Sequence, residues 1–446
     1  MLYSGRLFSQ SIFSYDEFIT IVKEHHPVSY MADLKTEQGE AYITKYKGGF
    51  DPVIYGNANQ KYFDKKQYYS YLNGGLKIPT WFGVTIKGGY DMNDGQRLNP
   101  ESYTVNTGLW NAGIEANLVK GLFIDQRRAD VQQSEYMQST SLQEQKLILN
   151  QLILDASIAY YDWYKSNQKV EVYKTALENA RMTLKNTIQN AELGDKAFVD
   201  TLKASIQVQE RLLKLSQSGL ELYNKKEMVN TFLWQDKFVP LEIDSAILPE
   251  NPVQVMPNAP NNMDQLVSNH PEVVIEQNKL SINKIDYRLK KESLKPTVKL
   301  KYNALSSDLG QGVIPDYSIE NYTWGATVSY PIFTRKERGD LKLYDIKTKE
   351  QSAKIADKSA SIKYKILTSY QQILSMKEQL EIQVQATLNY QLLYQAEKTL
   401  FDTGESSLFL VNTRELNWIN AQVKMVELIA IYNYSYSIYK YHLMNY

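Results

Sequence analysis

One long motif occurs twice in this sequence, and its two copies stand 210 positions apart. Residues 121–130 read GLFIDQRRAD and residues 331–340 read PIFTRKERGD. Gly194 and Gly404, farther along, stand at the same separation. A period of this length exceeds that of solenoid repeats, so it indicates a duplicated half-molecule. Each copy is expected to run from a strand through a long helix and a glycine turn into a second helix.

After the motif, both copies take the spacing of a long amphipathic helix. From Asp130 onward, apolar or small residues advance in alternating steps of three and four, which is typical of a coiled-coil seam. The first seam consists of Leu149, Leu152, Ala156, Ala159, Trp163, Ser166, Val170, Tyr173, Leu177, Ala180, Leu184, Thr187 and Ala191. The second consists of Ile362, Ile366, Ser369, Ile373, Met376 and Leu380. A helix of about 60 residues is ~90 Å long, which is too long for a compact domain.

Before each motif the period changes to two, which predicts strands with one apolar and one polar face. The apolar positions are Trp110, Ala112, Ile114, Ala116 and Leu118 in the first copy, and Trp324, Ala326, Val328, Tyr330 and Ile332 in the second. Upstream of the strands the copies differ by 244 positions, because His26-Pro27 matches His270-Pro271. The two offsets differ by 34, so the first copy has 34 extra residues in its strand region. Residues 72–90, centred on IPTW, are expected to form an additional hairpin.

These patterns predict two structural repeats and a connector. Residues 1–233 are the first repeat, with short helices, strands at about 51–120 and a long helical hairpin at about 130–233. Residues 234–262 are rich in proline and form a non-helical connector. Residues 263–446 are the second repeat, with a helix, strands at about 296–333 and a long helical hairpin at about 340–443.

Composition excludes several classes of function. Lys+Arg and Asp+Glu both number 50, so the charge gives no reason to expect nucleic acid as a partner. The chain has no Cys, and His25 and His26 are adjacent, which is not the spacing of a helical zinc pair. We find no Gly-rich phosphate loop and no hydrolase or zincin motif, so we expect neither an enzyme nor a cofactor. Residues 1–6 carry no signal-peptide pattern, which fits either a cytosolic protein or one whose signal is removed.

The duplicated order of elements resembles the TolC-like outer membrane efflux proteins, also called outer membrane factors. The resemblance covers the chain from about Asp16 onward. It rests on LFIDQRRA at 122–129, where strand enters helix, and on GESSLFLVN at 404–412, at the second hairpin turn. It implies a mixed α and β fold: a trimeric transmembrane β-barrel, with four strands from each protomer, continued by a long α-helical, coiled-coil barrel in the periplasm.

The resemblance also implies a function. The chain would be the outer-membrane channel subunit of a tripartite export system in a Gram-negative bacterium. As a homotrimer in outer-membrane lipid, it would passively conduct substrates delivered by a periplasmic adaptor and an inner-membrane pump. Drugs, metals and proteins all remain possible substrates. Two other readings are a periplasmic adaptor, which would have one hairpin flanked by lipoyl-like β-modules, and a soluble coiled-coil scaffold.

Two groups of residues near the hairpin turns are candidate sites. The turn itself is a candidate adaptor contact, unless its glycines serve only the turn: Gly194, Asp195, Gly404, Glu405, Ser406 and Leu408, of which all but the glycines are expected to be exposed. The resemblance implies an acidic constriction nearby, and Asp200 matches one of its positions. The second copy has Leu410 and Thr413 where acids are expected. Leu410 would then form an apolar constriction that gates by dewetting, or it packs between helices.

Aromatic residues are abundant, with 34 Tyr and 6 Trp. Those in and beside the predicted strands are candidates for a membrane-interface girdle: Trp81, Tyr90, Trp110, Tyr322 and Trp324. The tyrosines of the last helix are expected to pack within it instead: Tyr432, Tyr434, Tyr436, Tyr439 and Tyr441.

Overall fold

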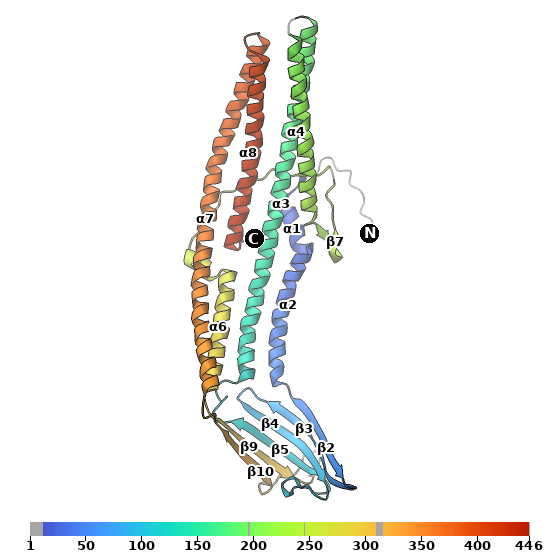
Figure 1. The fold of residues 1–446 in the computed structure, drawn as a ribbon, viewed down its shortest axis with the longest axis vertical. Coiled ribbons are helices and arrows are strands. Elements are labelled where there is room, and N and C mark those ends of the chain that lie inside the picture. The colour runs from blue at the N-terminus through green and yellow to red at the C-terminus, as the bar shows by residue number, and fades with distance from the viewer. Residues whose placement is uncertain (1–11, 195–196, 245, 309–314, 446) are drawn as a thin grey trace. The chain divides into compact units, whose positions relative to one another are not determined.

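The computed structural model describes residues 12–194, 197–244, 246–308 and 315–445. The chain divides into two compact units. The hairpin unit comprises Met1–Leu34, Glu144–Val273 and Lys358–Tyr446, and the sheet unit comprises Lys35–Gln143 and Val274–Asp357. Each unit is described by itself below, with the elements labelled in Figure 1.

Helices make up most of the described chain. They are α1 (Tyr15–His25), α2 (Pro27–Lys47), α3 (Gln126–Glu192), α4 (Phe198–Asn230), α5 (Met263–Ser268), α6 (Pro271–Glu292), α7 (Arg335–Asp402) and α8 (Leu408–Leu443). The strands are β1 (Ile12–Phe13), β2 (Val53–Phe63), β3 (Lys66–Pro79), β4 (Val84–Asp94), β5 (Leu109–Asn117), β6 (Trp234–Gln235), β7 (Val239–Pro240), β8 (Leu248–Pro249), β9 (Thr297–Ser306) and β10 (Tyr322–Ser329). No helix of the described segments is both long and apolar enough to cross a membrane.

The two long hairpins, α3–α4 and α7–α8, keep the sequence offset of 210 at their ends. Glu192 ends α3 and Asp402 ends α7, while Phe198 begins α4 and Leu408 begins α8. The predicted seams are confirmed, since every seam residue of α3 and of α7 is buried or half-buried. The division of the whole chain into repeats at residues 233 and 263 stays a prediction.

The core of the hairpin unit lies where α1 packs on α3 and α4. Phe18 and Val22 of α1 are fully buried against Tyr160 and Trp163 of α3 and Val229 of α4. The Tyr160 hydroxyl donates to the carbonyl of Phe13 at 2.6 Å and accepts from the amide of Glu250 at 3.1 Å. This tyrosine therefore ties the non-helical connector to the helices.

The repeated His-Pro pair has a physical reason, because each histidine caps the helix that its proline begins. Nδ1 of His26 accepts the amide N–H of Val28 at 3.1 Å, at the start of α2. Nδ1 of His270 accepts the amide N–H of Glu272 at 3.3 Å, at the start of α6. Proline suits the first helical position because its missing N–H would have no intrahelical partner there.

The sheet unit contains one antiparallel sheet of six strands in the order β10-β9-β5-β4-β3-β2. The predicted extra hairpin is confirmed: β3 pairs with β4 around a turn at residues 80–83. It lies between β2 and β5 in the same sheet, so the sheet has two strands more than the four that the resemblance implied. β2 and β10 are the two edge strands of the sheet (Figure 1).

The duplicated motif forms the junction between strand and helix. The Asp125 carboxylate accepts the amide N–H of Arg128 at 3.0 Å, which caps α3. The Arg128 guanidinium is buried and donates to that carboxylate and to the carbonyls of Gly121 and Leu122. Arg128 is thus ion-paired with Asp125.

Candidate functional site

The six-stranded sheet has one face that is apolar throughout its middle. Residues paired directly across neighbouring strands share a face, so the register assigns each side chain to one side. Apart from glycines and the strand ends, this apolar face consists of Ile54, Ala58, Leu72, Leu76, Ile78, Val84, Ile86, Tyr90, Met92, Trp110, Ala112, Ile114, Ala116, Val298, Leu300, Tyr302, Ala304, Tyr322, Trp324, Ala326 and Val328. Every strand contributes to it.

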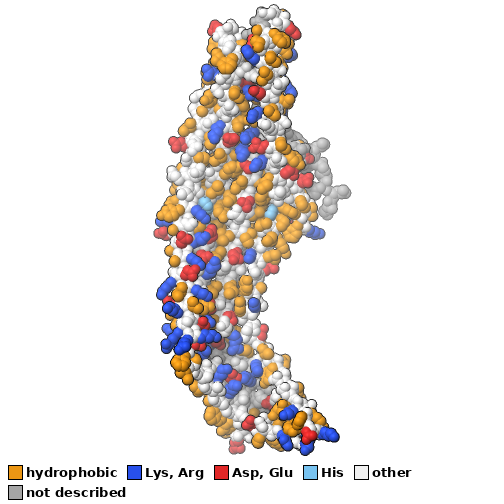
Figure 2. All heavy atoms as spheres, viewed as in Figure 1, with side chains coloured by type: hydrophobic (Ala, Val, Ile, Leu, Met, Phe, Trp, Pro, Cys, Tyr) orange, Lys and Arg blue, Asp and Glu red, His pale blue; other side chains and the backbone are white. Residues whose placement is uncertain are grey.

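No second layer covers this apolar face among the described residues. Ile54 is 84% exposed, Ile114 49% and Val328 69%, although a soluble sheet would bury such side chains. Hydrophobic side chains are visible at the surface over the strands in Figure 2. A bare apolar face of this extent marks an interaction with lipid or with another chain.

The opposite face carries the charged and amide side chains of the sheet. Asp91 of β4 accepts hydrogen bonds from Asn73 of β3 at 2.7 Å and from Asn111 of β5 at 2.8 Å. Lys87 of β4 pairs with Glu115 of β5. Lys87, Asp91, Asn111 and Glu115 line a cavity of about 390 Å³ on this polar face. The sheet therefore has an apolar face without cover and a hollowed polar face.

Four of the five aromatic candidates lie on the apolar face. Tyr90 and Trp110 are direct partners on β4 and β5, with ring centroids 4.8 Å apart. Tyr322 and Trp324 lie on β10 and are half to two-thirds exposed. Trp81 differs, since it lies in the β3–β4 turn and packs on Phe50, with ring centroids 5.3 Å apart.

The first hairpin turn begins at Gly194, whose φ of +83° is a conformation that favours glycine. A Cβ there would meet no other atom, so the backbone angle alone requires glycine. Asp195 lies outside the described residues. Sequence reasoning missed two neighbours, Leu193 at 77% and Phe198 at 83% exposure. Their exposure follows from the chain reversing there, where no neighbouring helix can cover them.

The second hairpin turn is held by polar contacts. Gly404 has a φ of +81°, and the amide of Glu405 donates to the carbonyl of Leu400 at 2.8 Å, which closes the helix end. The Ser406 hydroxyl bonds to the Glu397 carboxylate, which also lies 3.5 Å from the Arg414 guanidinium of α8. Glu397 therefore links the turn to both helices of its hairpin.

The prediction that Leu408 is exposed is wrong. Leu408 is 7% exposed because it begins α8 and turns inward, after Ser407 caps the helix by accepting the Leu410 amide. Phe409, the next residue, is 72% exposed instead. The most exposed apolar side chains at the two turns are thus Leu193, Phe198 and Phe409.

The constriction candidates lie within the first two turns of α4 and α8. Asp200 pairs with Lys203 at 3.0 Å in the first turn of α4. Leu410 is 39% exposed, and the Thr413 hydroxyl donates to the carbonyl of Phe409 at 2.8 Å. That these residues form a constriction of the channel stays a prediction.

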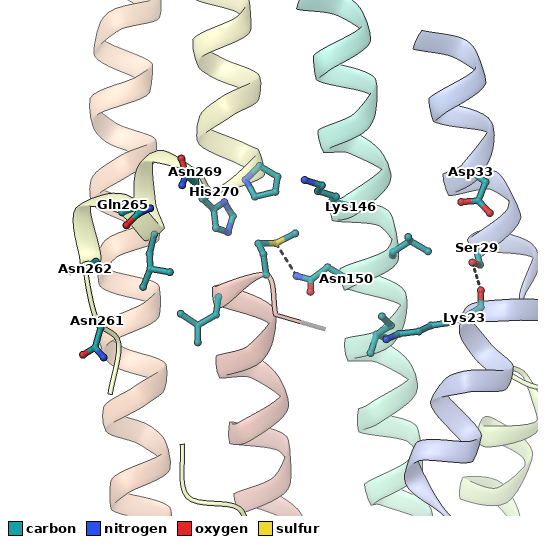
Figure 3. Close-up of a pocket in the computed structure, with 16 residues that line it drawn as sticks. Lys23, Ser29, Asp33, Lys146, Asn150, Asn261, Asn262, Gln265, Asn269 and His270 are labelled. Atoms are coloured by element: carbon teal, nitrogen blue, oxygen red, sulfur yellow. Dashed lines mark hydrogen bonds between the residues drawn. The ribbon is translucent and has the colours of Figure 1, made fainter. Parts of the chain in front are cut away.

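The hairpin unit also contains a cavity of about 810 Å³ whose walls are partly polar and partly apolar. Asn150, Gln265, Asn269 and His270 line it, and the Asn150 amide donates to the sulfur of Met444 at 3.1 Å (Figure 3). Lys23 and Asp33 lie on its opposite side (Figure 3). This cavity brings together none of the residues that the sequence singled out as sites.

Comparison with known proteins gives a result at the level of structure. No protein-family model matches the sequence, and no curated protein matches it. The CmeC outer membrane channel of Campylobacter jejuni is 13% identical, with a TM-score of 0.66 over 96% of this chain and 85% of that chain. The outer membrane protein VceC of Vibrio cholerae is 12% identical, with a TM-score of 0.66 over 96% and 95% of the two chains.

A third solved structure is that of the open state of the MtrE outer membrane channel of Neisseria gonorrhoeae. It is 11% identical, with a TM-score of 0.69 over 96% of this chain and 88% of that chain. Sequence identities this low show the fold and leave the function open. Over almost its whole length, the chain therefore has the TolC-like fold of these outer-membrane channels.

Proposed function

We propose that this protein is an outer-membrane channel subunit of an export system. The observation that carries the proposal is the six-stranded sheet, whose apolar face has no cover and whose polar face is hollowed. Strands of a transmembrane barrel alternate in this way, with apolar side chains toward lipid and polar side chains toward the lumen. The six strands have 8 to 14 residues, and about 9–11 residues suffice for a tilted strand to span a bilayer.

The channel forms from three copies of the chain in the outer membrane of a Gram-negative bacterium. One sheet has two open edges, and edges left unpaired in lipid would cost several kcal/mol for each orphaned backbone group. Joining copies edge to edge removes these edges. Trp81 and the aromatic residues of the strands then lie near the membrane interfaces, where Trp and Tyr are enriched.

The helical hairpins form the periplasmic part of the same channel. In this arrangement residues 1–233 and 263–446 act as two structural repeats, joined by the connector at 234–262. A periplasmic adaptor binds at the turns, through Gly194, Asp195, Gly404, Glu405 and Ser406 together with the exposed side chains beside them. An inner-membrane pump supplies the substrate and the energy, and the channel conducts passively.

The two-faced sheet also favours this function over its rivals. A soluble coiled-coil scaffold has no use for an apolar face without cover, and an adaptor with a single hairpin would not contain both α3–α4 and α7–α8.

Bilayer recordings on the purified protein test the proposal. The full chain, extracted in detergent and added to a planar lipid bilayer, is expected to give discrete ion-conducting steps, and boiled protein is expected to give none. A protein that stays monomeric in buffer without detergent, and conducts nothing, would refute the channel. A second experiment replaces both turns by Gly-Ser linkers. It should abolish copurification with a periplasmic adaptor and leave conductance in place.

A further inference from the structure

We infer that the β3–β4 hairpin is part of the membrane wall, so that three copies close a barrel of eighteen strands by pairing β2 of one copy with β10 of the next. This inference rests on the proposed channel function. Beyond that function, the inference specifies how many strands the barrel has and how wide it is. The alternative is that the hairpin folds away from the wall, which leaves four strands in each copy.

Side-chain contacts join the hairpin to the rest of the wall. Asp91 of β4 bonds at once to Asn73 of β3 and Asn111 of β5, so one carboxylate bridges three adjacent strands on the polar face. Lys87 and Glu115 form a second link between β4 and β5. Moving the hairpin out of the sheet would break both, and would also break the eight residue pairs of the β4–β5 ladder.

The apolar face continues across the hairpin without a break. In one row, Ile78 of β3 and Ile86 of β4 stand beside Ile114 of β5. Leu72 and Met92 form another pair of apolar partners farther along the hairpin. A hairpin outside the membrane would not need this row of apolar side chains on one face. Its alternation matches that of the strands on either side, as a lipid-facing strand requires.

The two edges are suited to pair with each other. β2 and β10 run in opposite directions, because the sheet is antiparallel and they are its first and sixth strands. Pairing them between copies therefore continues the antiparallel order around the ring. Both edges carry their apolar side chains on the same face, with Ile54 on β2 and Trp324 and Val328 on β10.

The number of strands sets the width of the barrel. A single copy has six strands, fewer than the eight of the smallest bacterial outer-membrane barrels, so it cannot form the channel alone. Barrel diameter grows roughly linearly with strand number, so eighteen strands give a barrel about 1.5 times as wide as twelve. Barrels of 16–18 strands hold an aqueous channel.

The direct test is to count strands in an electron-microscopy map of the full chain in lipid nanodiscs. Eighteen strands would support the inference. A trimer with twelve strands and a hairpin outside the wall would overturn it and leave the proposed channel intact. A protein that forms no ring in lipid would instead contradict the proposed function.

Engineered disulfides provide a second measurement, since the chain has no Cys. Ile86→Cys with Ile114→Cys should cross-link within one copy, because these residues are partners on β4 and β5. Ile54→Cys with Ala112→Cys should not, because two strands separate β2 from β5. In a further set of variants, each residue of β5 in turn is replaced by Cys in combination with Ile54→Cys. A cross-link in any of them would show that β2 pairs directly with β5 and would overturn the inference.

Cross-links between copies test the edge pairing. Val328→Cys is combined with Cys at Ile54, Gly56 or Ala58, on the same face of β2, and the controls use Tyr55 or Asn57, on the opposite face. Covalent trimers should form with a same-face partner and be lost in the controls, because a strand pair keeps matched faces. Trimers that never form with any same-face partner would refute β2–β10 pairing.

Deletion of residues 66–99 removes 34 residues and gives the first copy the length of the second. If the hairpin lies in the wall, the deleted protein should still form trimers, with a barrel narrower by about a third. If the hairpin lies outside, the barrel diameter should not change.

Discussion

Arg211 of α4 and Glu415 of α8 face each other across the two helical hairpins, with 3.9 Å between their charged groups. Both side chains are 7% exposed. Burial raises the pKa of Glu415, and the positive charge of Arg211 offsets only part of this rise. The contact therefore joins hairpins from opposite halves of the chain through a buried ion pair.

Removing one partner of this pair should destabilise the protein strongly. Glu415→Ala leaves the Arg211 guanidinium buried and uncompensated, for which a cost of about 3–5 kcal/mol is typical. Arg211→Ala should cost less as pH falls, because the remaining carboxyl can take up a proton. Thermal unfolding of the purified protein, followed by circular dichroism, measures both effects.

Replacing both partners should restore stability. Arg211→Met with Glu415→Leu removes two buried charges at once, and such replacements are often neutral or stabilising. Removing the exposed pair Lys354–Glu350 on α7 is the matched control, and it should cost at most about 1 kcal/mol. Single variants that unfold at the wild-type temperature would show that the pair does not hold the hairpins together.

Ile114→Arg should impair assembly in the membrane. Ile114 lies in the middle of the apolar face, where Arg in contact with lipid costs about 2–4 kcal/mol near the bilayer midplane. Asn303→Arg is the control, because Asn303 lies on the polar face of the adjacent strand. The amount of trimer on an unboiled gel reports assembly. If both variants assemble equally well, the apolar face does not contact lipid.

The sequence predicted the helices and strands well because their signals are local. Heptad steps identify the buried seam of α3, and alternation identifies the faces of β5, from a few neighbouring residues. The offset of 34 residues located the β3–β4 hairpin, although no pattern in it specifies the strand that it pairs with. Its place in the sheet depends on Asp91 meeting both Asn73 and Asn111, which are contacts between separate strands.

Burial near the hairpin turns could not be predicted for the same reason. Leu408 and Phe409 are adjacent apolar residues, and only packing decides which of them turns inward. Nor does any spacing relate Arg211 to Glu415, which lie in different halves of the chain. The His-Pro offset was visible in the sequence, but its role as a helix cap became evident only with the geometry of Nδ1.

The histidine caps predict a loss of stability in acid. Burial is the main cause that lowers the pKa of His270 to about 4, from an ordinary value near 6.5. Glu272 opposes this shift, while His442, Lys365 and Lys358 add to it. Between these two pKa values the unfolded chain binds the proton and the folded chain does not. Stability should therefore be fully present above pH 6.5 and fall as the pH drops toward about 4.

Two substitutions at this position separate capping from titration. His270→Asn keeps an acceptor for the helix N-terminus and should remove this part of the acid loss. His270→Ala should cost about 1 kcal/mol near pH 7.5, where the neutral histidine caps the helix, and this cost should shrink as the pH falls, because alanine neither caps nor titrates. Unfolding temperatures measured between pH 4.5 and 7.5 give the slopes. Parallel profiles for the wild type and His270→Asn would rule out this histidine as the source of acid sensitivity.

The last prediction concerns ion selectivity at the narrow end of the proposed channel. Leu410→Asp would place one added carboxylate from each of three copies at the constriction, and a ring of acidic side chains favours cations. Leu416→Asp is the control, because Leu416 is similarly exposed, at 44% against 39%, but lies about 120° around the same helix. Reversal potentials across a bilayer with a KCl gradient should shift toward cation selectivity for Leu410→Asp alone. An unchanged potential would mean that Leu410 packs between helices and does not line the pore.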